Sequence, residues 1–120
     1  MASLNGERHT ADKNLHRLDE IKAKVLVELE DDFVGLWELI REIRHRFPDA
    51  HENEVYDLTL RLVRDLLSSG RACAGHPTPN GRDFVPWSLS PGEAVARIAK
   101  EWNALEREPN IGDIVWFNTV

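Results

Sequence analysis

Cysteine is scarce in this chain: among 120 residues, only Cys73 carries a thiol. A single cysteine cannot form an internal disulfide, and a lone thiol is typical of proteins kept in the reducing cytosol. Cys73 and His76 have a C-x-x-H spacing, but no second pair is present to complete the four ligands of a structural zinc site. We therefore expect neither a metal ion nor a cofactor.

Long apolar runs are also lacking. No stretch approaches the roughly 20 apolar residues that a membrane-spanning helix needs. Residues 1–14 are polar and lack the apolar run of a signal peptide. These absences predict a cytoplasmic protein that does not enter a membrane. We expect a flexible N-terminal segment over residues 1–14 and a single globular domain over residues 15–120, a length that one hydrophobic core can serve.

Positive charge is in the minority. The chain has 15 Lys and Arg residues against 21 Asp and Glu residues, which gives a formal net charge of −6. Phosphate groups of nucleic acids and anionic lipids repel such a protein, so the charge disfavours non-specific attachment to either. Nucleic acid is therefore a disfavoured partner, although a local basic face is compatible with the composition.

Catalytic motifs are missing as well. The chain has no G-x-G-x-x-G run and no phosphate-binding loop. Carboxylate pairs occur, for example Glu106 and Glu108, but their positions favour solvated helix ends over a catalytic pair. These observations predict that the protein is not an enzyme. The catalytic alternative is an unrecognised site in which Cys73 is the nucleophile and His76 its base.

Apolar residues recur at helical spacing in four segments of the chain. Asp31 and Asp32 are predicted to cap the second helix, Gly70 to end the third, and Ser90 with Glu93 to form a capping box at the start of the fourth. The helices are expected near residues 14–29, 33–47, 52–69 and 91–105. The residues expected to be buried together are Leu36, Ile40, Leu62, Leu66, Ile98 and Trp102.

Between the third and fourth helices lies the stretch CAGHPTPNGRDFVPW. Its two β-prone arms, near residues 71–75 and 83–87, flank a turn that contains Asn80-Gly81. This pattern predicts a β-hairpin with a long loop. Residues 111–120 are β-prone in the middle and predict a C-terminal strand. The expected fold class is α+β and mainly helical, with four helices, a small hairpin and one further strand.

Tryptophan is frequent, with four in the chain. Trp102 lies on the apolar face of its helix, whereas the other three are compatible either with a small core or with an exposed patch for a protein partner. Tyr56 and Leu60 lie off the main stripe of the third helix and predict a second seam, covered by the N-terminal helix or by a second copy of the chain. The predicted partner-binding residues are Trp37, Tyr56, Leu60, Trp87 and Trp116.

The run VYDLTLRLVRDLLSSGRACAG, together with the later NGRDFVPW, resembles the end of a winged-helix domain, in which a helix closes on a glycine and leads into a two-stranded wing. The resemblance covers residues 33–87 and implies a winged-helix-like fold. It also implies DNA contacts, for which the candidate residues are Arg61, Arg64, Arg71 and Arg82. Three carboxylates, Glu52, Glu54 and Asp57, occupy the start of the helix that would meet phosphates.

Two main functional hypotheses emerge from these patterns. The first is a small acidic protein-binding module without catalytic activity, with the general look of immunity or antitoxin proteins. Tyr56, Leu60 and the surplus of tryptophan also predict that it forms a homodimer. The alternative is a winged-helix DNA-binding transcriptional regulator. The acidic balance, the surplus of tryptophan and the missing catalytic set favour the first.

Overall fold

The computed structural model describes the backbone of residues 2–120 and the side chains from Asn14 onward. The helices are α1 (Ala2–Glu28), α2 (Leu36–Arg46), α3 (Glu52–Ser68) and α4 (Pro91–Leu105). The strands are β1 (Val34–Gly35), β2 (Ala72–Pro77), β3 (Phe84–Pro86) and β4 (Trp116–Thr119). The predicted α+β, mainly helical fold class is confirmed, including the hairpin and the C-terminal strand.

Helix α1 begins earlier than the sequence predicts, at Ala2 rather than near residue 14. The predicted flexible segment, residues 1–14, falls almost wholly on residues that lie outside the described side chains, so the division into segment and domain stays a prediction. None of the described helices combines the length and the apolar character that crossing a bilayer requires.

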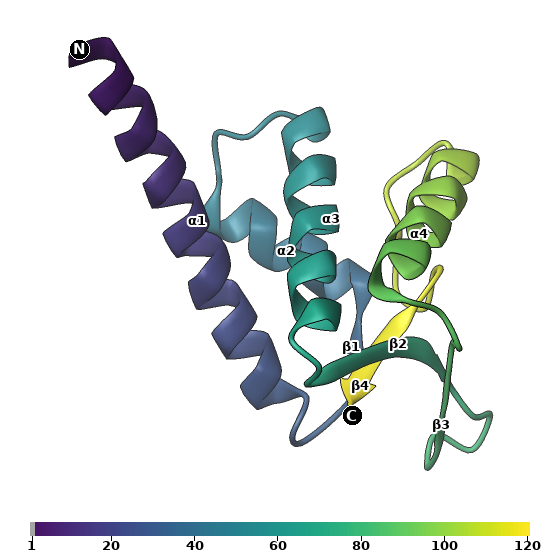
Figure 1. The fold of residues 1–120 in the computed structure, drawn as a ribbon. Helices are drawn as coiled ribbons and strands as arrows, with labels where there is room; N and C mark the ends of the chain where they lie inside the picture. The colour runs from purple at the N-terminus through teal and green to yellow at the C-terminus, as the bar shows by residue number, and fades with distance from the viewer. Residues whose placement is uncertain (1) are drawn as a thin grey trace.

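The strands form one antiparallel sheet in the order β1-β4-β2-β3. The C-terminal strand β4 lies in the interior of the sheet, where Phe117 pairs with Val34 on one side and with Ala74 on the other. Figure 1 shows α1, α2 and α3 gathered on one side of the molecule, α4 standing beside α3, and the sheet running beneath them. The last strand of the chain therefore joins the segment before α2 to the hairpin after α3.

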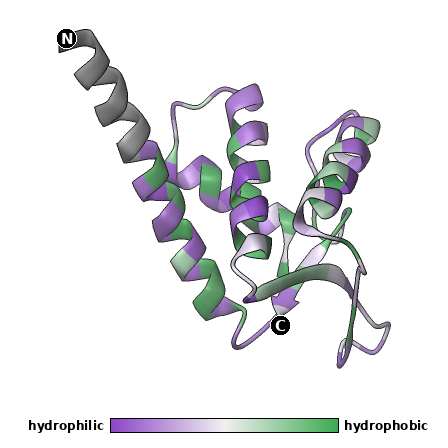
Figure 2. Cartoon of the chain, in the orientation of Figure 1, coloured by the Kyte–Doolittle hydropathy of each residue, from purple (hydrophilic) through white to green (hydrophobic). Residues whose placement is uncertain are grey.

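The core lies where α1, α2 and α3 meet the sheet. Each helix carries both hydrophilic and hydrophobic residues (Figure 2), as expected for helices that bury one face. All six residues predicted for the core are buried, with exposed fractions of 9% or less. From α1, the buried set adds Leu18, Ile21, Val25 and Leu26, and Leu29 in the turn after this helix is buried as well.

The predicted start of the second helix is wrong. Phe33 to Gly35 do not continue the helical stripe, because Val34 and Gly35 pair with Phe117 and Trp116 as strand β1. Nor do Asp31 and Asp32 cap the helix. The backbone N–H of Gly35 donates to the Glu38 carboxylate at 2.8 Å, so the cap lies at the residue where the strand ends.

The other helix boundaries agree closely with prediction. Ser90 accepts a hydrogen bond from the Glu93 N–H, and the Glu93 carboxylate accepts one from the Ser90 N–H, which completes the predicted capping box. This carboxylate contact with the Ser90 backbone lowers the pKa of Glu93. Gly70, directly after α3, has φ of +75°, the left-handed conformation that favours glycine.

Candidate partner-binding groove

A hollow lies between the first turn of α3, the last turns of α4 and helix α2. We call it the aromatic pocket. It encloses about 520 Å³. The ring of Tyr56 on α3 meets the ring of Trp102 on α4 edge-to-face, with centroids 4.8 Å apart and an interplanar angle of 65°. The other lining residues are Arg44, Glu52, Asn53, Val55, Asn103, Glu106, Arg107 and Glu108.

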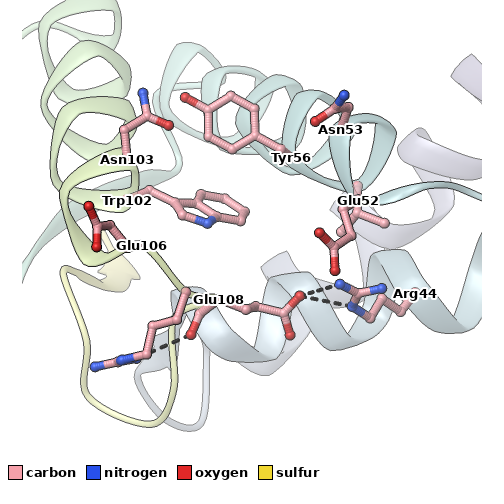
Figure 3. A pocket seen from close by; sticks show the side chains of 10 residues that line it. Arg44, Glu52, Asn53, Tyr56, Trp102, Asn103, Glu106 and Glu108 are labelled. Carbon is pink, nitrogen blue, oxygen red and sulfur yellow. Dashed lines mark hydrogen bonds and ion pairs between the residues drawn. The ribbon is translucent and has the colours of Figure 1, made fainter.

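Helical spacing on α4 explains why Trp102 reaches this pocket. Ala94, Ile98 and Trp102 are four residues apart and are all buried, so Trp102 continues the buried face of α4 toward the end of the helix. It retains 9% exposure, and its ring lies across the space between Glu106 and Glu52 (Figure 3). The aromatic pair thus forms one wall of the hollow, and the charged side chains form the others.

A second hollow adjoins the first, and we call it the Trp37 hollow. It encloses about 480 Å³, and its walls are Trp37, Arg41 and Arg44 of α2 together with residues 108–111. The guanidinium of Arg41 lies over the Trp37 ring, 4.9 Å from its centroid. Ile111 is 72% exposed at the rim, so this hollow offers apolar surface to an incoming group.

The two hollows share Arg44 and Glu108 as lining residues. The Arg44 Nε–H donates to a Glu108 carboxylate oxygen at 2.9 Å, and a second guanidinium N–H donates to the same oxygen. Figure 3 shows this ion pair across the aromatic pocket from Trp102. Both side chains are more than 40% exposed, so the pair contributes little to stability and can be rearranged at little cost. We use "the groove" for the two hollows together.

The segment between α4 and β4, residues 106–115, contributes residues to both hollows, and we call it the connector. Among described residues, the two non-glycine residues with positive φ are Glu106 at +56° and Ile114 at +67°, and both lie in it. The Val115 N–H donates to the Asp113 carbonyl at 2.8 Å, which closes a three-residue turn around Ile114. For a β-branched residue this backbone conformation is strained, so surrounding contacts must hold it.

The Asp113 carboxylate makes two contacts within the connector. Asp113 accepts hydrogen bonds from the Arg107 guanidinium and from the Asn110 backbone N–H, each at 2.7 Å. The Arg107 contact lowers the pKa of Asp113, and the same contact raises the pKa of Arg107. The two groups therefore stay ionised and tie the start of the connector to its middle.

Of the five residues predicted to bind a partner, the structure places two in the groove. Tyr56 lines the aromatic pocket and Trp37 the Trp37 hollow. Trp116 is half-buried on β4, and its ring approaches Gly35, whose other neighbour is the Trp37 ring. Trp87 lies apart, beneath the guanidinium of Arg97 at 3.8 Å.

Helix α4 contacts the Tyr56–Leu60 seam, a cover that the sequence does not predict: Tyr56 packs against Trp102 of this helix. Leu60, one turn further along α3, is half-buried against the core. The homodimer inferred from this seam stays a prediction, with less unexplained apolar surface to support it.

The four arginines proposed for DNA contacts are all exposed. Arg61 and Arg64 lie on α3, Arg71 precedes β2, and Arg82 lies in the hairpin loop. None of them forms an ion pair with any side chain from Asn14 onward. The three carboxylates at the start of α3, at positions 52, 54 and 57, are exposed as well.

The alternative catalytic pair is not assembled. Cys73 and His76 lie three residues apart on β2, and an odd spacing in a strand directs the two side chains to opposite faces of the sheet. The Cys73 thiol contacts the Thr119 carbonyl at 3.7 Å, and burial raises the pKa of this thiol, which disfavours the reactive thiolate. Within the described part of the chain, no cluster of three His, Cys, Asp or Glu side chains could hold a metal ion.

Sequence reasoning missed most residues of the aromatic pocket. Trp102 is recognised only as a core residue, and Glu106 and Glu108 only as a solvated helix end. The available signal is the run Glu106-Arg107-Glu108 directly after a helix whose apolar face ends in tryptophan. Nothing in the spacing, however, brings Arg44 and Glu52 to the same place.

We compared the chain with protein-family models, with curated proteins and with solved structures, and none of them matches it. The residues of the groove are therefore the basis for a functional conclusion.

Proposed function

We propose that this protein is a small, non-catalytic, cytoplasmic binding module that receives a protein partner in the groove beside α4. The observation that carries this proposal is the junction of two hollows, about 520 and 480 Å³, across one exposed ion pair. Each hollow contains an aromatic side chain of the kind that anchors protein interfaces, Tyr56 in one and Trp37 in the other.

The chemistry of the groove supports binding over catalysis. Neither hollow is lined by a described His, Cys, Ser or Lys side chain that could act as nucleophile or base beside a carboxylate, and Arg44 and Arg107 are each paired with a carboxylate. A module of the immunity or antitoxin kind, which acts by covering another protein, is one form of this function. Homodimerisation is a further part of the proposal, and sedimentation at micromolar concentration tests it directly: a monomer alone would remove that part.

Photo-crosslinking tests the proposed docking site. A photo-reactive phenylalanine analogue would replace Asn103 in the aromatic pocket or Ile111 at the rim of the Trp37 hollow, one position at a time, in the cells that make the protein. Val85 on β3 is the control matched to Ile111: both are exposed β-branched residues, but Val85, which is 60% exposed, lies outside the groove. We expect one protein partner, crosslinked from positions 103 and 111 and not from position 85. Crosslinks at position 85 alone, or none at the groove positions, would refute the proposal.

A second candidate function is the winged-helix DNA-binding regulator. It is favoured by four exposed arginines that have no ion-pair partner among the described side chains. We expect no binding of duplex DNA above background at physiological salt, because the three exposed carboxylates at the start of α3 repel phosphates. If binding does occur, its logarithmic salt dependence should flatten by about two units at most when Arg71→Ala and Arg82→Ala are combined. Sub-micromolar binding that depends on these arginines would place this function first.

A further inference from the structure

The charges in the aromatic pocket do not balance. Arg44 is neutralised by Glu108, and Arg107 by Asp113. Glu52 and Glu106 have no ion-pair partner among the side chains from Asn14 onward. The pocket therefore holds two carboxylates that an incoming positive charge could pair with.

The aromatic wall suits the same kind of ligand. Two other tryptophans of the molecule have a guanidinium over the ring: Arg97 lies 3.8 Å from the Trp87 centroid, and Arg41 lies 4.9 Å from that of Trp37. Trp102 has no such cation among the described residues, although its ring lines the pocket. A cation beside this indole would gain a cation–π contact, which is strongest with tryptophan.

From this combination of a hollow, an indole and two unpaired carboxylates, we infer that the aromatic pocket receives the arginine or lysine side chain of a basic linear segment of the partner protein. The inference rests on the proposed function and names the chemistry of its partner. The net charge of −6 supports a basic partner, since complementary charge speeds association. Figure 3 shows where the cation would lie, between Trp102 and the Arg44–Glu108 pair, with Glu106 and Glu52 at either end.

The Trp37 hollow suits an apolar side chain beside the basic one. It adjoins the aromatic pocket across Arg44 and Glu108, and Ile111 is 72% exposed at its rim. An apolar residue close in sequence to the arginine or lysine of the partner would contact this side chain. A free amine would leave this second hollow empty, so a peptide segment fits the groove better than a small cation does.

The first experiment uses N-acetyl-arginine methylamide and its neutral counterpart, N-acetyl-citrulline methylamide, as probes. The indole N–H signals of the four tryptophans are monitored by NMR in the full chain, with Trp102→Phe to assign one of them. We expect the arginine probe to shift the Trp102 signal and the citrulline probe to leave it unchanged. An equal response to both probes, or no response of Trp102 to arginine at saturating concentration, would overturn the inference.

The second experiment measures affinity. Random linear peptides are selected on the immobilised protein, and the tightest peptide is titrated by calorimetry. We expect enrichment of Arg or Lys next to an apolar residue, and a loss of about tenfold in affinity for the double variant Glu52→Gln with Glu106→Gln, as for charge-assisted hydrogen bonds. The matched control is Glu30→Gln with Asp31→Asn, which removes the same charge at the exposed turn after α1. In Figure 1 this turn lies at the bottom of the molecule, whereas α3 begins and α4 ends at the top. The control should change affinity less than about twofold.

The outcomes separate this inference from the proposed function. Crosslinking from positions 103 and 111 to a partner whose binding is unaffected by the double variant would refute the basic ligand and leave the docking site standing. A shift of Trp102 caused by duplex DNA rather than by the arginine probe would also overturn the inference, because phosphates would then occupy the pocket. Absence of any groove crosslink would refute the proposed function itself.

Discussion

Helix α3 has two faces that differ in how they are covered. On one face, Leu62, Val63 and Leu66 are 0% exposed, packed between the other helices and the sheet. On the other, Tyr56 and Leu60 are half-buried, and Tyr56 packs against Trp102 of α4. The first face is closed by regular elements with their own apolar stripes. The second face ends in the aromatic pocket, because beyond Trp102 the segment next to α3 is the irregular connector and not a helix or strand. The closed face stabilises the fold, and the open face has room for a ligand.

Removing a side chain from the closed face should have the largest effect. Leu66 is fully buried, so Leu66→Ala loses its transfer free energy and leaves a cavity, at a cost of about 2–5 kcal/mol in the free energy of unfolding. Urea titration measures it. Leu89→Ala, at a leucine that is 39% exposed, is the control and should cost less than about 0.5 kcal/mol. Equal costs for the two leucines would show that α3 does not bury the face described here.

A substitution in the β2–β3 hairpin should have the next largest effect on stability. A Cβ added at Gly75 would lie 2.1 Å from the Val85 carbonyl oxygen and 2.7 Å from the Pro86 Cα, both backbone atoms of the neighbouring strand. Gly75→Ala should therefore push β3 away from β2 and cost about 1–3 kcal/mol, as overpacking does. Amide hydrogen exchange should locate the loss in residues 75–86. Gly92→Ala on α4, where a Cβ meets nothing, should leave exchange unchanged.

The sequence predicts the closed face far better than the open one. Leu62 and Leu66 repeat at helical spacing, and this spacing alone specifies which side of α3 is buried. Strand β1 cannot be predicted from periodicity because it has only two residues. Its partner, Phe117, is also distant in the sequence, so no local pattern indicates the pairing. The positive φ of Glu106 has no signal in the residue type, and only tertiary packing brings Glu52 beside Trp102.

A smaller effect is expected where the groove wall meets the sheet. A Cβ at Gly35 would lie 2.6 Å from Nε1 and 2.7 Å from Cδ1 of Trp37, atoms of a side chain that can move. Gly35→Ala should cost about 1 kcal/mol, less than Gly75→Ala, because a rotamer change relieves the contact. The indole N–H signal of Trp37 should shift while that of Trp87 stays in place. An unmoved Trp37 signal would show that the β1–α2 junction, and not the ring, has yielded.

The smallest effect should come from a single charge in the connector. Asp113→Asn keeps an oxygen that can accept the Asn110 N–H, so the change isolates the charge that pairs with Arg107. Because Arg107 lowers the pKa of Asp113 in the folded protein, the stabilisation is fully present above the unfolded pKa of this carboxyl. This stabilisation is lost as pH falls through the pKa that Asp113 has in the folded protein.

The Asp113→Asn variant should therefore melt at a slightly lower temperature than the parent protein at neutral pH, and the difference in Tm should shrink toward zero in strongly acidic solution. Asp83→Asn, which removes an exposed carboxylate without an ion-pair partner among the described side chains, should match the parent at every pH. A Tm difference for Asp113→Asn that does not change with pH would show that the shape of the side chain, and not its charge, holds the connector against the groove.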